Sequence, residues 1–455
     1  MKTNKIFILL LFIIITFAYG CKDECKKCDE CPSTDGLIKE EECPKGEDCT
    51  GLINPEDCPM CEDCTNLIDP EQCPKGEDCT GLINPEDCPV TEEKSEYVYL
   101  LGENGLTVKG ISKLVGEEII IPDEDYYEGS LYKVVNVNID NMNDYLGKKL
   151  YLGKNITSVS VSKESQLTGP RGMNNAFKYI EVSEENEIYA SKDGVLYSKD
   201  FSELIIYPRY KDSKVFDLDE RTVKIGQSAF KDNDYIEVIN ISSDGIVIEK
   251  NAFKNCSSLK EFKADNIIQI GSNAFENCLS LLEFKASVIT KIESYAFKNC
   301  SNLKEFEVTD RLVNTIGEYV FENCYNLINC VISSEKYGAG PDLVTSTKIG
   351  QGVFKNCFSL KTVSIPYEIV NKDMFYNCYN LENVSLGKQI FEGAFTNCLS
   401  LTKLRIFESM IIEAGAFVSC KNLVFYTNAS KFSENWNENF HDGNEIIYNS
   451  ASMPK

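Results

Sequence analysis

The most regular feature of the chain is an apolar pattern that recurs nine times between Ile225 and Leu423. Most copies have the form I-x-x-x-x-F-x-N-C-x-x-L, and the phenylalanines recur at intervals of 20 to 24 residues with one interval of 33. A constant period of this length indicates a solenoid, because one coil cannot bury its own apolar side and must stack on its neighbours. The phenylalanines are Phe230, Phe253, Phe275, Phe297, Phe321, Phe354, Phe375, Phe395 and Phe417.

An alternating run follows the leucine of each copy, as in L-K-E-F-K-A. Alternation with period two predicts a strand with one face inward. We expect Leu259, Phe262 and Ala264 to point inward, and Glu261 and Lys263 to point outward. Repeated in every coil, these strands predict a parallel sheet along one flank. The expected fold class is therefore α/β, a right-handed solenoid that is mostly parallel β with short helical or 3-10 turns.

The cysteine of the motif recurs at one position, three residues before the leucine. Small apolar thiols suit an inward-facing column. Parallel side-chain directions disfavour the dihedral angle of a disulfide, although neighbouring coils lie close enough for one. The pattern therefore predicts free, buried thiols in the solenoid.

Residues 21–94 have a different period, with cysteines every fifteen residues. Apart from Leu-Ile pairs there is little to bury, and such small units need covalent or metal staples. In an exported protein we expect disulfides. The alternative is a metal-binding or redox centre, because C-x2-C-x2-C occurs twice with a spacing like that of iron–sulfur or zinc sites. The disulfide candidates are Cys25, Cys28, Cys31, Cys43, Cys49, Cys58, Cys61, Cys64, Cys73, Cys79 and Cys88.

The first twenty residues predict an export signal. Lys2 and Lys5 precede a fourteen-residue stretch, Ile6 to Tyr19, that is apolar apart from Thr16 and shorter than the roughly 20 residues of a typical membrane span. Ala18 and Gly20 place small residues at the −3 and −1 positions of the expected cleavage site before Cys21. A cysteine at this position also suits bacterial lipidation, so the mature protein is expected to be secreted or tethered by its amino end.

The amino-acid composition narrows the classes of partner and activity that we expect. The chain has 71 Asp and Glu against 46 Lys and Arg, for a net charge of −25, which argues against nucleic acid and anionic lipid as partners. It contains one histidine, His441, and no recognisable catalytic motif. We therefore predict a protein that is not an enzyme and that needs no cofactor. We expect His441 and Trp436 to lie in a segment that caps the solenoid.

The I-G-x-x-A-F-x-x-C-x-x-L pattern from Ile225 to Leu423 resembles the BspA-like leucine-rich repeat family, and a shorter unit and hairpin extend the resemblance from about residue 100 to residue 430. The resemblance implies a leucine-rich repeat solenoid on an exported cell-surface or secreted protein that adheres to host matrix proteins or to other cells. The expected organisation is a signal peptide (1–20), an acidic spacer (21–94), a divergent amino-terminal part (95–224), the repeats (225–430) and a cap or tail (431–455).

The outward strand positions are the candidate partner-binding face. Half of this face is alternately charged, and the other half is rich in hydroxyl and amide groups. The alternative interpretation is an ordinary solvated face on which lysines and glutamates compensate each other. The predicted residues are Glu261, Lys263, Glu283, Lys285, Glu305, Glu307, Asn329, Thr362, Ser364, Asn383, Ser385, Lys403 and Arg405. We expect the polar half, from Ser364 to Arg405, to carry recognition.

Overall fold

The structure is a computed structural model, and it describes residues 96–111, 116–138, 147–160, 177–309, 313–332, 347–365 and 368–450. These residues fall within one compact unit, Glu92–Lys455. The predicted signal peptide, Cys21 and all eleven disulfide candidates lie outside the described residues, as do both C-x2-C-x2-C clusters.

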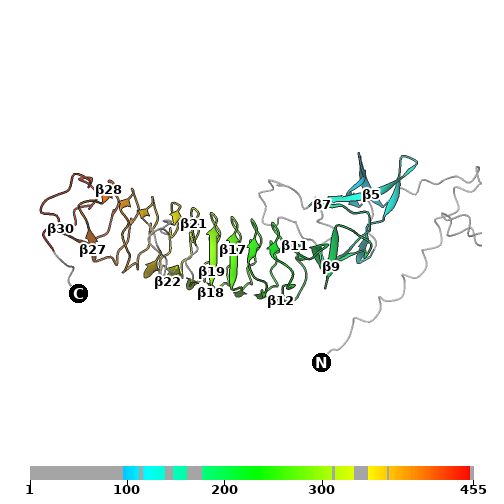
Figure 1. Cartoon of the computed structure of the whole chain (residues 1–455), viewed down its shortest axis with the longest axis horizontal. Coiled ribbons are helices and arrows are strands. Elements are labelled where there is room, and N and C mark those ends of the chain that lie inside the picture. The colour runs from blue at the N-terminus through cyan, green and yellow to red at the C-terminus, as the bar shows by residue number, and fades with distance from the viewer. Residues whose placement is uncertain are drawn as a thin grey trace, which may run out of the picture. The chain divides into compact units, whose positions relative to one another are not determined.

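The predicted parallel sheet is present and has seven strands, one from each of seven successive coils (Figure 1). Neighbouring strands pair in register, for example Phe284 with Phe306 and Phe306 with Cys330. The sheet contains β12 (Val215–Asp217), β14 (Val238–Asn240), β16 (Glu261–Lys263), β18 (Glu283–Ala286), β20 (Glu305–Val308), β22 (Asn329–Ile332) and β24 (Thr362–Ser364).

A second sheet of nine strands was not predicted. In the repeats its strands end at the isoleucine that opens each motif, and several contain only two residues, which is too short for alternation to be visible. Its strands are β9 (Tyr189–Lys192), β10 (Val195–Ser198), β11 (Glu203–Ile206), β13 (Lys224–Ile225), β15 (Ile246–Ile248), β17 (Asn266–Ile270), β19 (Val288–Ile292), β21 (Thr315–Ile316) and β23 (Lys348–Ile349).

The expectation of helical or 3-10 turns is wrong, because no helix occurs among the described residues. The described part is therefore an all-β solenoid rather than an α/β fold. The reason lies in two left-handed residues per coil. In one coil these are Asn273 (φ 59°), just before the alanine, and Asn277 (φ 62°), just before the cysteine. Asparagine and glycine tolerate this conformation, and its recurrence four residues apart interrupts any helical run.

Shorter sheets flank these two. The carboxyl-terminal coils form β25 (Ile369–Val370), β26 (Gln389–Ile390) and β28 (Ile411–Ile412) in one sheet, and β27 (Lys403–Ile406), β29 (Val424–Thr427) and β30 (Glu445–Ile447) in another. The amino-terminal part has a five-stranded and a three-stranded sheet. They are built from β1 (Tyr97–Gly102), β2 (Gly105–Ile111), β3 (Glu118–Ile120), β4 (Glu124–Tyr127), β5 (Ser130–Asn138), β6 (Lys149–Leu152), β7 (Ser158–Ser160) and β8 (Tyr179–Val182).

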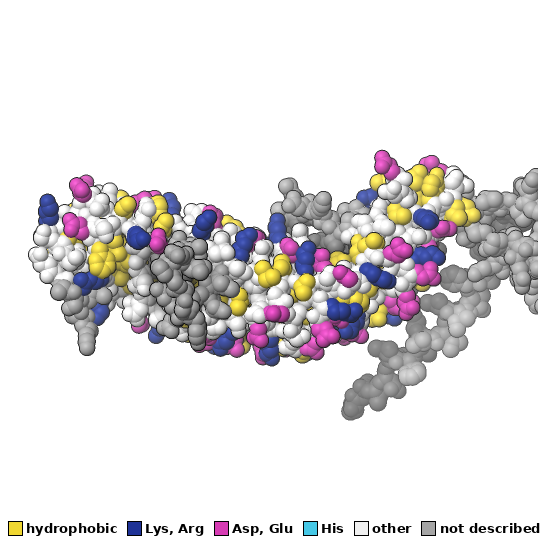
Figure 2. Space-filling view, viewed as in Figure 1, with side chains coloured by type: hydrophobic (Ala, Val, Ile, Leu, Met, Phe, Trp, Pro, Cys, Tyr) yellow, Lys and Arg dark blue, Asp and Glu magenta, His cyan; other side chains and the backbone are white. Residues whose placement is uncertain are grey.

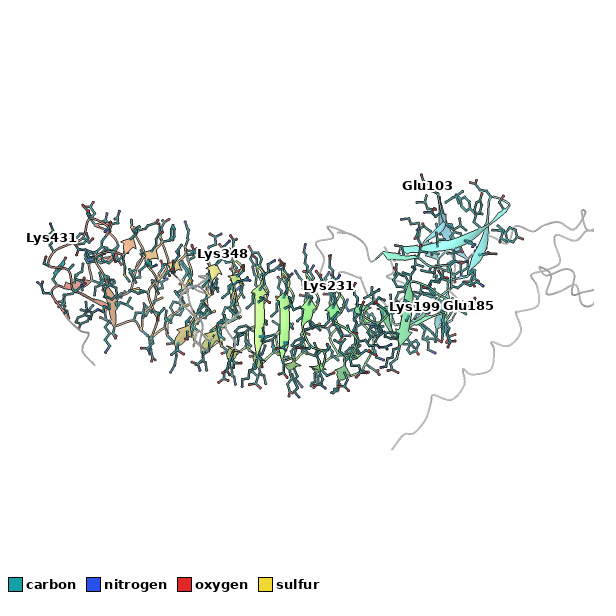
Figure 3. All side chains as sticks on the ribbon, in the orientation of Figure 1. Glu103, Glu185, Lys199, Lys231, Lys348 and Lys431 are labelled. Carbon is teal, nitrogen blue, oxygen red and sulfur yellow. The ribbon has the colours of Figure 1, made fainter. Side chains whose placement is uncertain are left out.

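The core consists of columns of identical side chains between the two sheets, while charged groups such as Lys348 lie at the periphery (Figure 3). The motif phenylalanines stack from coil to coil with ring centroids 4.7 to 5.5 Å apart. The predicted strand orientation is confirmed, because Leu259, Phe262 and Ala264 are buried and Glu261 and Lys263 are exposed.

The prediction of free, buried thiols is also confirmed. Each motif cysteine points its Sγ at the carbonyl oxygen of the phenylalanine in the preceding coil, at 3.0 to 3.2 Å. Burial raises the pKa of the Cys300 thiol, and likewise that of Cys256, Cys278, Cys324, Cys357, Cys378 and Cys398. Since the thiolate is the reactive form, the folded solenoid keeps them inert.

At the carboxyl end, the ring of Trp436 is buried and its Nε1 donates a hydrogen bond to the carbonyl oxygen of Phe407 at 3.2 Å. Trp436 also forms an isolated parallel bridge with Ile412. Phe440 is fully buried against Phe417 and Phe425. These contacts cover the apolar side that the last coil would otherwise expose.

Candidate interaction surface

The seven-stranded sheet brings most of the predicted face together as two columns. In one column Glu283, Glu305, Asn329 and Thr362 are direct partners across β18, β20, β22 and β24, and Asn383 continues it through a bridge to Thr362. In the other column the partners are Lys263, Lys285, Glu307, Val331 and Ser364. Their spacing is therefore set by backbone hydrogen bonds rather than by flexible loops.

The charged half of this face pairs its charges internally. Lys263 lies 2.7 Å from Glu261, and Lys285 lies 2.6 Å from Glu283 and 3.5 Å from Glu305. The hydrogen bond from Lys285 to Glu283 raises the pKa of Lys285. Exposed pairs of this kind add little stability. In this half, the arrangement matches the compensated, solvated face that was the alternative interpretation.

The polar half carries no charge in its first coils. The Oγ1 of Thr362 donates a hydrogen bond to Oδ1 of Asn329 at 2.7 Å. Ser364, Asn383 and Ser385 are exposed to solvent. Hydroxyl and amide groups on a rigid sheet can donate and accept hydrogen bonds without the desolvation cost of a charge, so this half is chemically suited to a protein surface.

The strand pairing beneath the predicted face is interrupted before its last members, although Asn383, Ser385, Lys403 and Arg405 line one hollow. Lys403 and Arg405 lie on β27, which pairs with β29, and the seven-stranded sheet ends at β24 with a single bridge to Asn383. The coil between Phe375 and Phe395 is the shortest of the repeats, at 20 residues. On this side it contributes a single bridge at Asn383, and on the other side the two-residue strand β26.

A hollow lies at this break. Its apolar lining comes from Val384, Leu386, Leu404, Phe407 and Met410, and its polar lining includes Asn383, Ser385, Lys403 and Arg405. A second hollow lies over the charged half, beside Glu261, Lys263, Glu283 and Lys285. Both hollows therefore fall on the sequence-predicted face.

A column of hydrogen-bonded asparagine side chains was not predicted from the sequence. Each Nδ2 donates to Oδ1 of the asparagine one coil earlier, at 2.6 to 2.9 Å, and the first asparagine donates to the buried carboxylate of Asp232. The recurring N of the motif was the available signal. The column contains Asn255, Asn277, Asn299, Asn323, Asn356, Asn377 and Asn397.

A partly exposed aromatic column was also not predicted. Tyr325, Phe358 and Tyr379 each follow the motif cysteine in three successive coils, and their rings stack at 5.0 and 5.1 Å. Tyr325 is 41% exposed and Tyr379 is 37% exposed. This position varies among coils, so the repeat pattern gave no sign that its aromatic side chains form a surface.

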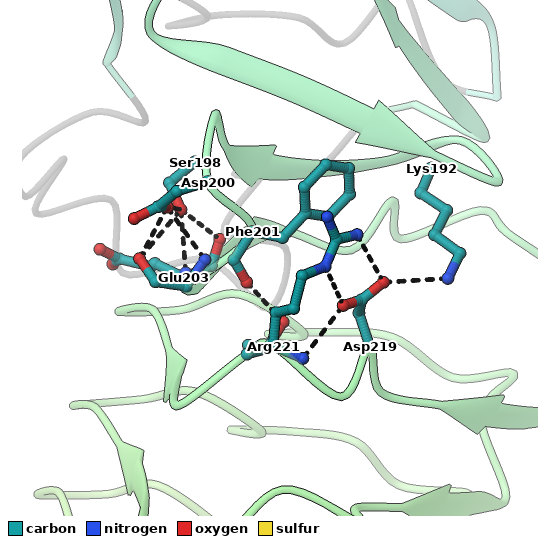
Figure 4. Close-up of polar contacts among 9 residues, drawn as sticks. Lys192, Ser198, Asp200, Phe201, Glu203, Asp219 and Arg221 are labelled. Atoms are coloured by element: carbon teal, nitrogen blue, oxygen red, sulfur yellow. Dashed lines mark hydrogen bonds and ion pairs between the residues drawn. The ribbon is translucent and has the colours of Figure 1, made fainter.

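The strongest electrostatic cluster lies where the nine-stranded sheet begins (Figure 4). The buried carboxylate of Asp219 accepts two hydrogen bonds from the Arg221 guanidinium, at 2.8 and 3.0 Å, and one from Lys192 at 2.9 Å. The Arg221 contact, with help from Lys192, holds the pKa of Asp219 well below its usual range. The guanidinium also lies 3.8 Å from the ring of Phe201. The cluster ties Lys192 of β9 to Asp219 and Arg221, which follow β12.

We also searched the described part of the chain for a metal-binding group and for a membrane-spanning helix. It contains no group of three or more side chains that could hold a metal ion, and none of its elements is a helix that could cross a bilayer. The visible surface intersperses basic and acidic side chains with small apolar patches (Figure 2).

One known family matches the repeats. Residues 223–340 and 343–446 match the BspA type leucine rich repeat region, in six copies. No curated protein matches the chain.

Solved structures of three bacterial proteins are similar. A leucine-rich repeat protein of Bacteroides ovatus is 18% identical over 78% of this chain and 98% of that chain, with a TM-score of 0.44. A leucine rich cell surface protein of Faecalibacterium prausnitzii is 16% identical over 81% and 100%, with a TM-score of 0.37. A leucine-rich repeat protein of Eubacterium ventriosum is 19% identical over 63% and 60%, with a TM-score of 0.33, so this chain spans about 60% of its length. On the match over residues 223–340 and 343–446, the repeat region belongs to the BspA-type leucine-rich repeat family.

Proposed function

We propose that the chain is a cell-surface or secreted adhesion module whose solenoid binds a protein of a host matrix or of a neighbouring cell. In this proposal residues 1–20 direct export and residues 21–94 act as an acidic, disulfide-stapled spacer. The observation that carries the proposal is the in-register alignment of outward side chains on the seven-stranded sheet. Such alignment gives a partner a rigid surface to bind, at little ordering cost.

We place the partner site on the polar half of the face and on the hollow at the sheet break. The apolar floor of Leu386, Leu404 and Phe407 with a polar rim has the anatomy of a protein-binding surface, in which an apolar centre is surrounded by hydrogen-bonding groups. Phe407 is 41% exposed and has the Arg405 guanidinium 5.4 Å from its ring centroid. The charged half serves as the solvated flank.

The test is binding of the purified exported chain to immobilised extracellular-matrix proteins and to intact cells. Ser364→Lys combined with Asn383→Lys places two charges on the proposed face at exposed positions, and we expect it to abolish binding. The matched control, Asn422→Lys with Ser430→Lys, adds the same charges at exposed positions off the face and should bind normally. Equal binding by both double variants would exclude this face.

A further inference from the structure

The two hollows on the sheet face differ in charge. Among the described residues, four carboxylates and two lysines line the hollow over the charged half. The hollow at the sheet break is lined by two cations, Lys403 and Arg405, and by one carboxylate, Glu382. Glu382 lies 3.9 Å from Lys361 of the preceding coil. The hollow at the sheet break is therefore the one that offers a positive surface to a ligand.

A strand fixes the spacing of the two cations. Burial alternates along β27, in which Lys403 is exposed, Arg405 is half exposed and the other two residues are buried. The side chains of Lys403 and Arg405 therefore leave the strand on the same side, with their Cα atoms about 6.6 Å apart. Phe407 follows two residues later, and the Arg405 guanidinium lies 5.4 Å from the centroid of its ring. The order along the chain is thus cation, cation, aromatic ring.

The floor of this hollow favours a peptide over a sugar. Leu404 and Met410 are buried in the floor, and Phe407 is exposed beside them. Sugar hydroxyls placed against these side chains would give up hydrogen bonds to water without replacing them. An apolar side chain of a peptide would instead bury its surface there. The lining thus combines groups that attract carboxylates with a place for an apolar side chain.

We propose that the hollow at the sheet break binds an extended acidic segment of the protein partner. Residues two apart in an extended chain are also about 6.6 Å apart, so two carboxylates at this spacing can reach Lys403 and Arg405 together. An apolar side chain two residues beyond them packs on Phe407. The inference rests on the proposed function, and it adds the chemistry of the segment that the partner site recognises: acidic, any residue, acidic, any residue, apolar.

The net charge of the chain does not prevent this contact. The chain carries a net charge of −25, which repels an acidic segment at a distance. At physiological ionic strength, charges more than about 8 Å apart are largely screened. Carboxylates seated in the hollow contact Lys403 and Arg405 directly, so the local positive charge decides the interaction.

The experiment uses three short peptides, capped at both ends, that read the same in both directions and so fit either direction along β27. L-T-E-T-E-T-L carries the full pattern, L-T-Q-T-Q-T-L lacks the carboxylates, and S-T-E-T-E-T-S lacks the apolar ends. Binding of each dye-labelled peptide to the full-length exported chain is measured by fluorescence anisotropy at physiological salt. We expect each altered peptide to bind about tenfold more weakly than L-T-E-T-E-T-L, through lost ion pairs or lost apolar burial.

Variants of the chain locate the site. Lys403→Glu reverses one charge at an exposed position and should weaken binding of L-T-E-T-E-T-L by about tenfold or more. The matched control, Lys421→Glu, reverses an exposed lysine outside the lining of the hollow and should bind like wild type. Ser364→Lys with Asn383→Lys should also keep the peptide, because added positive charge does not repel carboxylates. The same two lysines hold the body of a whole partner off the sheet.

The outcomes separate this inference from the proposed function. Equal binding of the three peptides, or equal binding of L-T-E-T-E-T-L by wild type and Lys403→Glu, would overturn the inference. So would a sialylated oligosaccharide that displaces the peptide and loses its own binding in Lys403→Glu. If the chain binds matrix or cells while the peptides show no such pattern, the inference fails and the proposed function stands. If the peptide pattern holds while the chain binds neither matrix nor cells, the proposed function fails and the acidic selectivity of the hollow stands.

Discussion

Substitution of Asn299 separates the two roles that we assign to the asparagine column. Asn299 has a positive φ of 62°. Its Nδ2 donates to Asn277 at 2.8 Å, and its Oδ1 accepts from Asn323 at 2.8 Å. Any residue without a side-chain amide loses both hydrogen bonds. A residue that has a Cβ and disfavours the left-handed conformation, such as alanine, adds backbone strain as well.

The magnitudes follow from these contacts. Two hydrogen bonds at about 0.5–1.5 kcal/mol each give a loss of about 1–3 kcal/mol for Asn299→Gly, which keeps the backbone relaxed. Asn299→Ala loses the same bonds and adds about 1–2 kcal/mol of left-handed strain. We therefore expect the free energy of unfolding to decrease in the order wild type, Asn299→Gly, Asn299→Ala.

The assay is denaturant unfolding followed by circular dichroism on the three proteins side by side. If alanine is tolerated as well as glycine, the left-handed residue is not a constraint on the coil, and it cannot be the reason that the described coils lack helical turns. If both variants are as stable as the wild type, the hydrogen-bonded column contributes nothing to stability. Either result would refute one of the two roles of the asparagine column.

Three further outcomes are expected. The solenoid thiols are buried and should resist alkylation in the native chain and react only under denaturant, all the more at Cys300, whose pKa burial raises; labelling of Cys300 in folded protein would contradict this. Phe354→Ala should lower the free energy of unfolding by about 3–5 kcal/mol, since Phe354 is fully buried between two stacked rings; a loss below about 1 kcal/mol would argue against a packed column. Asp219→Asn should lower the free energy of unfolding by about 1–3 kcal/mol at neutral pH. The variant loses the ion pairs of a buried carboxylate with Lys192 and Arg221, whose own side chains are half exposed. The folded pKa of Asp219 is depressed, so its contribution is present above the unfolded pKa of about 4 and is lost as pH falls further; the difference between wild type and variant, measured by unfolding at several pH values, should therefore disappear in acid.

The sequence was sufficient for the columns whose members recur at fixed spacing. Phe275, Cys278 and Leu281 keep their offsets in nearly every coil, and a solenoid converts a fixed offset directly into a stack. The inward direction of Phe284 followed from alternation alone. These predictions needed no information about how the two flanks of the coil are arranged.

The remaining features depend on geometry that spacing does not contain. Strands such as β13 are two residues long and acquire their conformation from pairing with neighbouring coils. The motif run around Asn277 has a helix-compatible composition, and it is the left-handed backbone that prevents a helix. The break in strand pairing before Lys403 could not be predicted from the spacing, because the coil concerned keeps its motif and is only one or two residues shorter than its neighbours.

Site-specific photo-cross-linking on the exported chain tests the proposed partner face most directly. A cross-linking side chain is introduced at Asn383, beside the hollow, or at Asn422, which is exposed elsewhere, and each protein is irradiated on matrix or intact cells. We expect a discrete protein partner to be linked at position 383 and none at position 422. Equal linking at both positions, or none at 383 under conditions where the chain binds, would contradict a partner site on the polar half of the sheet face.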